Sequence, residues 1–589
     1  MDGRPELLGR ARWLKKAEVA VVKKAVRVQG VAKPKGGDDA KAATAQLRKI
    51  PQVAEVALTE EELQRKLGEL MSSRGRKGTD PREVLRKLEV LTRGARKFGS
   101  KVEIPILMHL VSAMYDASRG IDDYMDVQQW RTCSRCLTRI TTLLDANKVL
   151  SLGQMSAEDA TDLLIKTQQT ALMAAKKKAQ EEKDEEEKAP VDPNIIPCVG
   201  TLGSFVQRLE DEYTKALQQI NPHTSEYVAR LSDEGSLIQL AEAVFVYYRR
   251  VGDHTAAASV ALLHVEHIYY KHDTVAKAVC RAHAFNTKWG RFADIHPSCT
   301  SKMVAVSAQQ RDVTNTHPAT FSGYPVVEVP ATNPAGTIAA LTQFIFKHAD
   351  ERIKTRALLC SVYHHALHDR FYRARDLFLI SHIQDVIDKA DIKTQILYNR
   401  VMASLGLSAF REGLIQKAHD CLQNICSGRP LQVRELLAQG QARWTDKDPE
   451  QERIERRRLI PYHMHINPDL LDSCHLTCAM LLELPYMARG MTQPNPVNQN
   501  VVSRQFRKFM QNYNRQVFTG PPENTREHVM AAAKSMVSGD WQKACNFILG
   551  MEVWNLIPNE GGAKVKAMLN TKLKEEAVRT YLLSSGVSA

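Results

Sequence analysis

Apolar residues recur at helical spacing along most of this chain. The clearest run has successive intervals of 3, 4, 4 and 3 residues: Val206, Leu209, Tyr213, Leu217 and Ile220. Side chains at this spacing lie on one face of a helix, and Asn221-Pro222 should end it because the residue before a proline disfavours helical backbone. The DPRE sequence at residues 80–83 marks a helix start, with an N-cap, a first-turn proline and a capping-box glutamate.

A second pattern predicts helices packed in antiparallel pairs. In two places a small residue is followed by a glycine at a turn and then by Ala-x-x-x-large, and a third place lacks the glycine. A small residue lets two helix backbones approach closely, and the glycine reverses the chain between them. The expected packing residues are Gly406, Gly413 and Ala418 in the first pair, Gly539 and Ala544 in the second, and Ala374 in the third.

These patterns predict an all-α fold, an irregular helical-repeat solenoid of the TPR-like or HEAT-like kind. The alanines of the three pairs are 44 and 126 residues apart, so the repeats have no strict period. Changes in composition suggest seven segments: a basic extended arm (1–57), an N-terminal helical domain (58–175), a charged linker (176–199), helical repeats (200–285), a loop or insertion (286–336), TPR-like repeats (337–445) and a C-terminal helical region (446–589).

The amino-acid composition indicates in which cellular compartment this helical chain is found. Its 11 cysteines among 589 residues are too few and too irregularly spaced for a disulfide scaffold, so we expect a reducing, cytoplasmic location. No stretch of about 20 residues is apolar enough to span a bilayer, and we therefore expect no membrane contact.

Charge points to a polyanionic partner. The net charge is +14, and the first 50 residues hold 13 basic and 5 acidic side chains. Such clusters attract RNA phosphates without reading sequence, although each of them can equally be a solvated face. The candidate RNA contacts are Lys15, Lys16, Lys23, Lys24, Arg74, Arg76, Lys77, Arg456, Arg457, Arg458, Arg507 and Lys508.

Motifs that could carry catalysis are incomplete. Cys133 and Cys136 form a C-x-x-C without a second pair at zinc-site spacing, and Cys474 and Cys478 fit the buried face of a helix. The sequence HHALH at residues 364–368 has the histidine spacing of a zinc protease helix, but a histidine stands where the general-base glutamate should be. We therefore predict no enzyme, cofactor or metal, and a zinc hydrolase using these histidines and a distant ligand is the opposing hypothesis.

Short sequences in both halves of the chain resemble one family, that of the C subunit of eukaryotic translation initiation factor 3. The resemblance covers about residues 60–285 and 340–582. The matching sequences include RGRKGTD (74–80), PHTSEYV (222–228), YHHALH (363–368), QILYNR (395–400), HMHIN (463–467) and GPPE (520–523).

This resemblance implies a non-catalytic scaffold protein whose helical repeats lead into a PCI helical region at residues 446–589. The implied partners are other subunits of the factor, especially a and e, the RNA and proteins of the small ribosomal subunit in the preinitiation complex, and initiation factors 1 and 5. The family's long acidic tract does not precede the basic arm in this sequence. The seven residues that follow Leu582 are too few to form its winged helix, so either the sequence is truncated or the element is absent. A PCI scaffold of the proteasome-lid or signalosome type is the alternative.

Overall fold

The computed structural model describes residues 59–74, 80–117, 123–155, 195–275, 334–426, 430–440, 449–492, 501–516, 520–557 and 561–584. The chain divides into two compact units, residues 1–62 and 63–589. Only residues 59–62 of the first unit are described, so the basic arm and most of the predicted loop at 286–336 lie outside the described residues. Within the described ranges, no helix combines the length and apolar character needed to cross a membrane.

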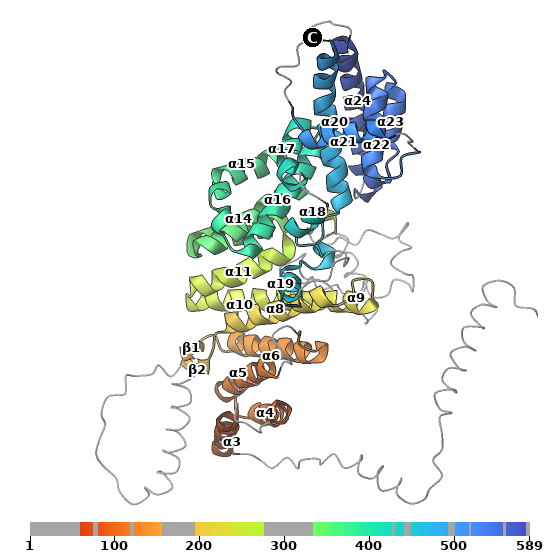
Figure 1. Ribbon diagram of the computed structural model, residues 1–589. Coiled ribbons are helices and arrows are strands. Elements are labelled where there is room, and N and C mark those ends of the chain that lie inside the picture. Colours follow the sequence, from red (N-terminus) through yellow and green to blue (C-terminus); the bar gives the residue numbers. More distant parts are fainter. Residues whose placement is uncertain are drawn as a thin grey trace, which may run out of the picture. The chain divides into compact units, whose positions relative to one another are not determined.

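Helices in the first half of the second unit pack against their neighbours in sequence. Here α4 contacts α5, α5 contacts α6, α6 and α8 contact α10, and α10 contacts α11 (Figure 1). One core, which includes the fully buried Leu88 and Trp130, is shared by these helices. The bounds are α3 (Glu60–Ser73), α4 (Pro81–Ala95), α5 (Ser100–Asp116), α6 (Val127–Ala146), α8 (Leu202–Gln219), α9 (Ser225–Leu231), α10 (Glu234–Val251) and α11 (His254–Ile268).

The same mode of packing continues to the C-terminal helix. Helix α11 contacts α13 and α14, α14 contacts α16, α16 contacts α17, α17 contacts α20, and α20 contacts α24. The bounds are α13 (Pro334–His348), α14 (Glu351–Leu367), α15 (Phe371–Ile380), η4 (Ile383–Asp385), η5 (Ile387–Lys389), α16 (Ile392–Arg411), α17 (Ile415–Cys426), α18 (Pro430–Leu436), α19 (Pro449–Arg458), η6 (Tyr462–Met464), α20 (Pro468–Thr492), α21 (Arg504–Arg515), α22 (Thr525–Val537), α23 (Trp541–Leu549), η7 (Glu552–Leu556) and α24 (Gly561–Ser584).

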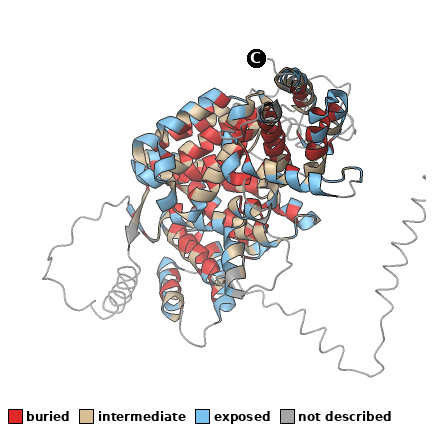
Figure 2. Cartoon of the chain, turned by 45° about the horizontal axis from the view of Figure 1, so that its top comes forward, coloured by how far each residue is buried: buried red, intermediate tan, exposed pale blue. Residues whose placement is uncertain are grey.

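Buried residues lie on the inner faces of these helices and exposed residues on their outer faces (Figure 2). A single core cluster runs from Ala258 on α11 to Leu573 on α24. The predicted all-α helical-repeat fold with a PCI-like helical region is therefore confirmed.

Helix starts and faces follow the sequence pattern. The Asp80 carboxylate accepts the Arg82 N–H at 3.0 Å, with Pro81 in the first turn of α4. The predicted apolar face of α8 is buried at Val206, Leu209, Tyr213 and Leu217, and the helix ends at Gln219, next to the predicted stop. The predicted N-cap at Asp80 is thus confirmed. The core-facing stripe is confirmed at four of its five positions, since Ile220 follows the helix and is partly exposed.

One small sheet was not expected. Strand β1 (Ser151–Met155) pairs in parallel with β2 (Ile195–Val199), with Leu152 opposite Ile196. The second strand lies inside the segment predicted to be a charged linker. Strands of five residues are too short to show a clear alternation, and Pro197 argued against one because proline removes a ladder donor. The Leu152 N–H donates to the Tyr247 hydroxyl at 2.9 Å, which attaches the sheet to α10.

Residues 459–465 cross back to the first half of the helical stack. The Tyr227 hydroxyl donates to His463 Nδ1 at 2.8 Å, and His463 Nε2 lies 3.3 Å from the Tyr270 hydroxyl, which donates to buried Glu234. The Gln218 amide also donates to the Leu459 carbonyl at 2.6 Å. We call residues 459–465 the crossing segment.

Candidate interaction surfaces

The turns of the three helix pairs need a left-handed backbone. Gly413 lies between α16 and α17 with φ +78°, and Gly539 lies between α22 and α23 with φ +87°. In the pair formed by α14 and α15, Asp369 adopts φ +56°. Aspartate tolerates this conformation better than most residues, which explains how the third pair turns without a glycine.

Helices α16 and α17 are in close contact at Gly406. A Cβ atom on Gly406 would lie 2.5 Å from Cγ of Leu422, so no larger residue fits without movement. The alanines singled out by the sequence pattern are all fully buried: Ala374 on α15, Ala418 on α17 and Ala544 on α23.

Half of the candidate basic residues lie outside the described residues. These are Lys15, Lys16, Lys23 and Lys24 among residues 1–57, and Arg76 and Lys77 between α3 and α4 in sequence. Among the others, Arg74 follows α3 and is engaged with α5. Its Nε donates to the Asp116 carboxylate at 2.8 Å, and its guanidinium donates to the Ser112 hydroxyl at 2.7 Å. A phosphate would therefore have to compete with Asp116 for this side chain.

The two candidates on α21 have opposite environments. Arg507 donates to Glu483 at 2.8 Å, and the side chains are 19 % and 0 % exposed. Lys508, one residue later, is exposed. Because Phe506 and Met510 bury the inner face of α21, the helix directs Arg507 inward and Lys508 to solvent. Arg507 thus fastens α21 to α20, and Lys508 remains accessible to a partner.

Three consecutive arginines end α19. Arg456, Arg457 and Arg458 are all exposed, and Arg456 pairs with Glu452 at 2.8 Å on its own helix. Exposed pairs of this kind contribute little to stability, so exchanging the carboxylate for another anion costs little. This cluster is the largest accessible group of candidate cations in the described part of the chain.

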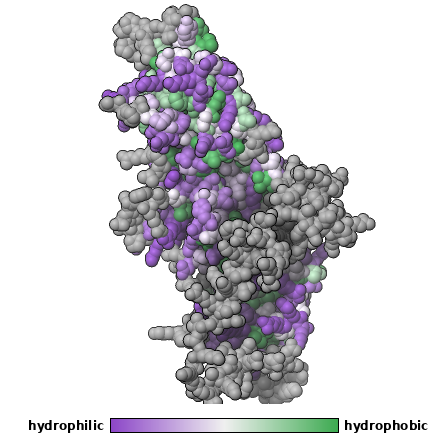
Figure 3. Space-filling model, turned by 90° about the vertical axis from the view of Figure 1, so that its right-hand side faces the viewer, coloured by the Kyte–Doolittle hydropathy of each residue, from purple (hydrophilic) through white to green (hydrophobic). Residues whose placement is uncertain are grey.

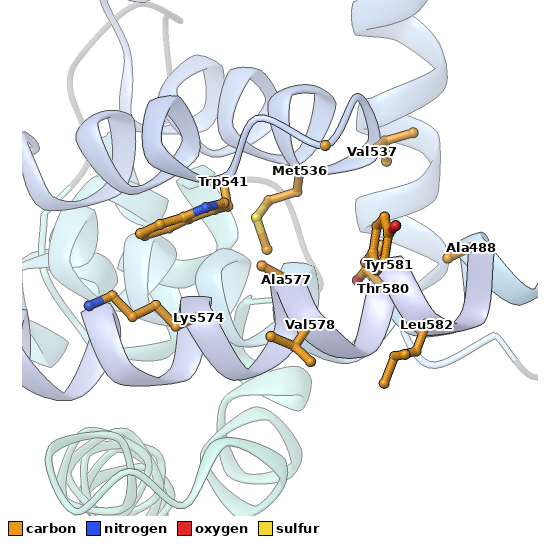
Figure 4. A pocket seen from close by; sticks show the side chains of 11 residues that line it. Ala488, Met536, Val537, Trp541, Lys574, Ala577, Val578, Thr580, Tyr581 and Leu582 are labelled. Atoms are coloured by element: carbon orange, nitrogen blue, oxygen red, sulfur yellow. The ribbon is translucent and has the colours of Figure 1, made fainter. Parts of the chain in front are cut away.

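A groove of about 600 Å³ opens between the α22–α23 turn, α20 and α24. Its lining is mainly apolar, including Ala488, Met536, Val537 and Trp541, with Lys574 and Tyr581 as its ionisable residues (Figure 4). The Lys574 ammonium lies 5.7 Å from the Trp541 ring centroid. Such a lining suits apolar contact, and its described residues include no carboxylate or histidine.

Outside this groove, hydrophobic side chains are dispersed over the face of the C-terminal helices that Figure 3 shows. Figure 3 shows this described surface as mainly hydrophilic, with small separate hydrophobic spots. A surface of mixed polarity is typical of interfaces between subunits that also exist apart.

The cysteine and histidine motifs lie largely inside the helical core. Cys133, Cys474 and Cys478 are buried free thiols, while Cys136 is partly exposed. Burial raises the pKa of the Cys133 thiol to about 12, which keeps it protonated and unreactive. The prediction that Cys474 and Cys478 serve as core side chains is confirmed.

We expect His475 to make the protein less stable in acid. Burial, followed by repulsion from His419, lowers its pKa to about 4, and neither ring nitrogen has a hydrogen-bond partner among the described residues. Between pH 6.5 and 4 the unfolded chain binds the proton more tightly, so stability is unaffected above pH 6.5 and falls below it. At pH 5, His475 lowers the free energy of unfolding by about 2 kcal/mol relative to neutral pH.

The measurement is the urea midpoint of unfolding at pH 7.5 and pH 5. A His475→Leu variant should lose part of the acid sensitivity, whereas His528→Ala, at a hydrogen-bonded surface site, should keep all of it. Equal pH dependence in the wild type and the His475→Leu variant would contradict this assignment.

Comparison with known proteins gives one consistent result. Residues 16–161 and 151–493 match the family described as the N-terminus of eukaryotic translation initiation factor 3 subunit 8. The chain is 34 % identical to the C subunit of eukaryotic translation initiation factor 3 from Chaetomium globosum over 586 residues, which covers 96 % of this chain and 60 % of that protein. The C subunit from Schizosaccharomyces pombe is 34 % identical over 519 residues, covering 87 % and 50 %.

The C subunit from Mycosarcoma maydis is 35 % identical over 541 residues, covering 89 % of this chain and 53 % of that protein. The chain thus spans between half and about three fifths of the length of these curated relatives. Family and fold agree with the resemblance found in the short sequences. The chain belongs to the family of the C subunit of eukaryotic translation initiation factor 3.

Proposed function

We propose that this chain is a non-catalytic, cytoplasmic scaffold of translation initiation factor 3. It holds neighbouring subunits, chiefly a and e, through its helical surfaces and contacts the small ribosomal subunit in the preinitiation complex. Initiation factors 1 and 5 are further partners of the same assembly.

The observation that carries the proposal is the stack of helix pairs in a member of this family. Stacked pairs expose a long surface on which several proteins can bind side by side. The mainly apolar groove at α22–α24 and the dispersed polarity elsewhere suit protein contacts, and the accessible arginines of α19 suit RNA. Electrostatic contact with RNA adds affinity without requiring a particular base sequence.

Cross-linking of the assembly purified from cytosol tests the scaffold role. We expect cross-links from the α10–α24 helices to several different subunits and to small-subunit ribosomal proteins. Recovery of the chain without any other subunit of the factor would refute the proposal.

The basic cluster on α19 gives a separate prediction. Replacing Arg456, Arg457 and Arg458 by alanine should weaken binding to small ribosomal subunits at low salt and have less effect at high salt, where screening already removes such contacts. The slope of log affinity against log salt should fall by about 2 to 3, or about 0.7–0.9 for each lost phosphate contact.

A matched control removes the same charge elsewhere. Arg82, Arg86 and Lys87 are exposed on α4 and are outside the candidate set, so their replacement by alanine should leave the slope unchanged. If both triple variants bind alike at low salt, the α19 cluster makes no specific contribution.

A further inference from the structure

Three potential metal ligands meet where α11 approaches α14. His364 lies in the last turn of α14, His368 is the residue that caps the end of this helix, and Asp273 lies in the segment after α11. The Asp273 Oδ1 atom is 3.8 Å from His364 Nε2 and 3.2 Å from His368 Nε2. All three ligand atoms lie within 4.8 Å of one another. The sequence pattern supplied the two histidines but not the carboxylate, which comes from a position 91 residues before His364.

Backbone carbonyl groups set the orientation of both imidazole rings. His364 Nδ1 donates to the Tyr269 carbonyl at 3.2 Å, and His368 Nδ1 donates to the His364 carbonyl at 2.8 Å. Because a carbonyl can only accept, each neutral ring carries its proton on Nδ1 and has a lone pair on Nε2. Metal-binding histidines are commonly held in this way, with the second nitrogen bonded to a carbonyl or carboxylate.

Two of the three ligand atoms lack hydrogen-bond partners. His364 Nε2 and Asp273 Oδ1 are buried atoms with no partner among the described residues, and His364 is only 2 % exposed. Both atoms are acceptors when the rings are neutral, and they face each other. A buried acceptor without a hydrogen-bond partner is destabilising, so two acceptors that face one space favour a bound cation between them.

We propose that Asp273, His364 and His368 bind one zinc ion, which links the end of α11 to α14. Two imidazole nitrogens and one carboxylate oxygen form a ligand set that zinc accepts, with water in the fourth position. The Asp273 side chain is 24 % exposed, which leaves access for that water. His365 directly follows the first ligand, at the position of the general-base glutamate in a zinc protease helix, and supplies no carboxylate, so the proposed role is structural and not hydrolytic.

Binding requires modest rearrangement. Ligand atoms bound at 2.0–2.2 Å to a tetrahedral zinc lie about 3.3 Å apart. The distance from His368 Nε2 to Asp273 Oδ1 already has this value, whereas His364 Nε2 must move closer to Asp273 Oδ1. The Asp273 N–H donates to His368 Nε2 at 3.2 Å, and zinc would replace this hydrogen bond. His272 stacks on the His368 ring, with ring centroids 4.4 Å apart, and helps to hold it in place.

The test uses the full chain without a histidine tag. Elemental analysis after dialysis against limiting zinc should find about one equivalent, and zinc should raise the melting temperature. Asp273→Asn and His368→Ala should each weaken zinc binding at least about 100-fold, because loss of an outer-shell partner alone costs about 10–100-fold. His365→Ala, the neighbouring histidine, should bind zinc as the wild type does.

Circular dichroism of each variant establishes that it is folded before zinc is added. X-ray absorption at the zinc edge should show nitrogen and oxygen ligands without sulfur. The proposal is overturned by a wild-type chain that retains no zinc, by equal zinc binding in the wild type, Asp273→Asn and His368→Ala, or by sulfur ligands, which would assign the metal to cysteines.

Discussion

Replacing Arg507 by alanine is expected to destabilise the C-terminal helices by about 3–5 kcal/mol, because it leaves a buried charge without its partner. Glu483 is 0 % exposed, and its carboxylate accepts hydrogen bonds from the Arg507 side chain and from the Ser503 backbone N–H. Once the guanidinium is removed, the Glu483 carboxylate keeps only the Ser503 N–H of these two donors. The loss of stability therefore comes mainly from leaving the buried Glu483 charge without its counter-ion, and less from losing the attraction between the two side chains.

Two measurements separate this effect from a loss of RNA contact. The urea midpoint should fall, and the amides of α21 should exchange faster with solvent. Lys508→Ala, one position along the same helix, should change stability by no more than about 0.5 kcal/mol, as is usual for an exposed site. If the two variants are equally stable, the Arg507–Glu483 pair does not hold α21 in place.

Gly406→Val is expected to cost about 2–3 kcal/mol by overpacking the contact between α16 and α17. A Cβ atom alone would lie 2.5 Å from Cγ and 2.6 Å from Cδ2 of Leu422, before the two methyl groups are added. Replacing a glycine inside a helix normally improves helix propensity by up to about 1 kcal/mol, which is smaller than the steric cost. The steric term should therefore decide the outcome.

A double variant tests the geometry directly. Leu422→Ala alone should destabilise the protein because it empties a fully buried site. Combined with Gly406→Val, it should cost less than the sum of the two single changes, since the alanine removes the atoms that clash. Strict additivity in thermal or urea unfolding would show that the two positions do not contact each other.

The sequence predicts local features of this fold well. The cap at Asp80, the buried face of α8 and the turns at Gly413 and Gly539 depend on residues close together in the chain. Capping, periodicity and left-handed turns are short-range effects, so they can be recognised without knowing the tertiary structure. The family was also recognisable, because short matching sequences occur in one order through most of the chain.

Long-range contacts could not be inferred in the same way. Nothing near Arg507 in the sequence indicates that its partner is Glu483, 24 residues earlier, and Arg74 pairs with Asp116, 42 residues later. A cationic cluster in sequence can therefore combine an arginine that is paired inside the protein with a lysine that faces solvent, as Arg507 and Lys508 do. The carboxylate beside His364 and His368 was missed for the same reason.

The crossing segment ties together parts of the chain that are far apart in sequence. Its hydrogen bonds join Leu459 and His463 to residues 241 and 236 positions earlier. Loss of the chain from Leu459 onward, through a protease cut or a premature stop, would leave the buried Tyr227 side chain without its His463 partner, far upstream of the lesion. Damage late in the chain would thus expose the early helices to degradation, so that a shortened product is removed and not assembled.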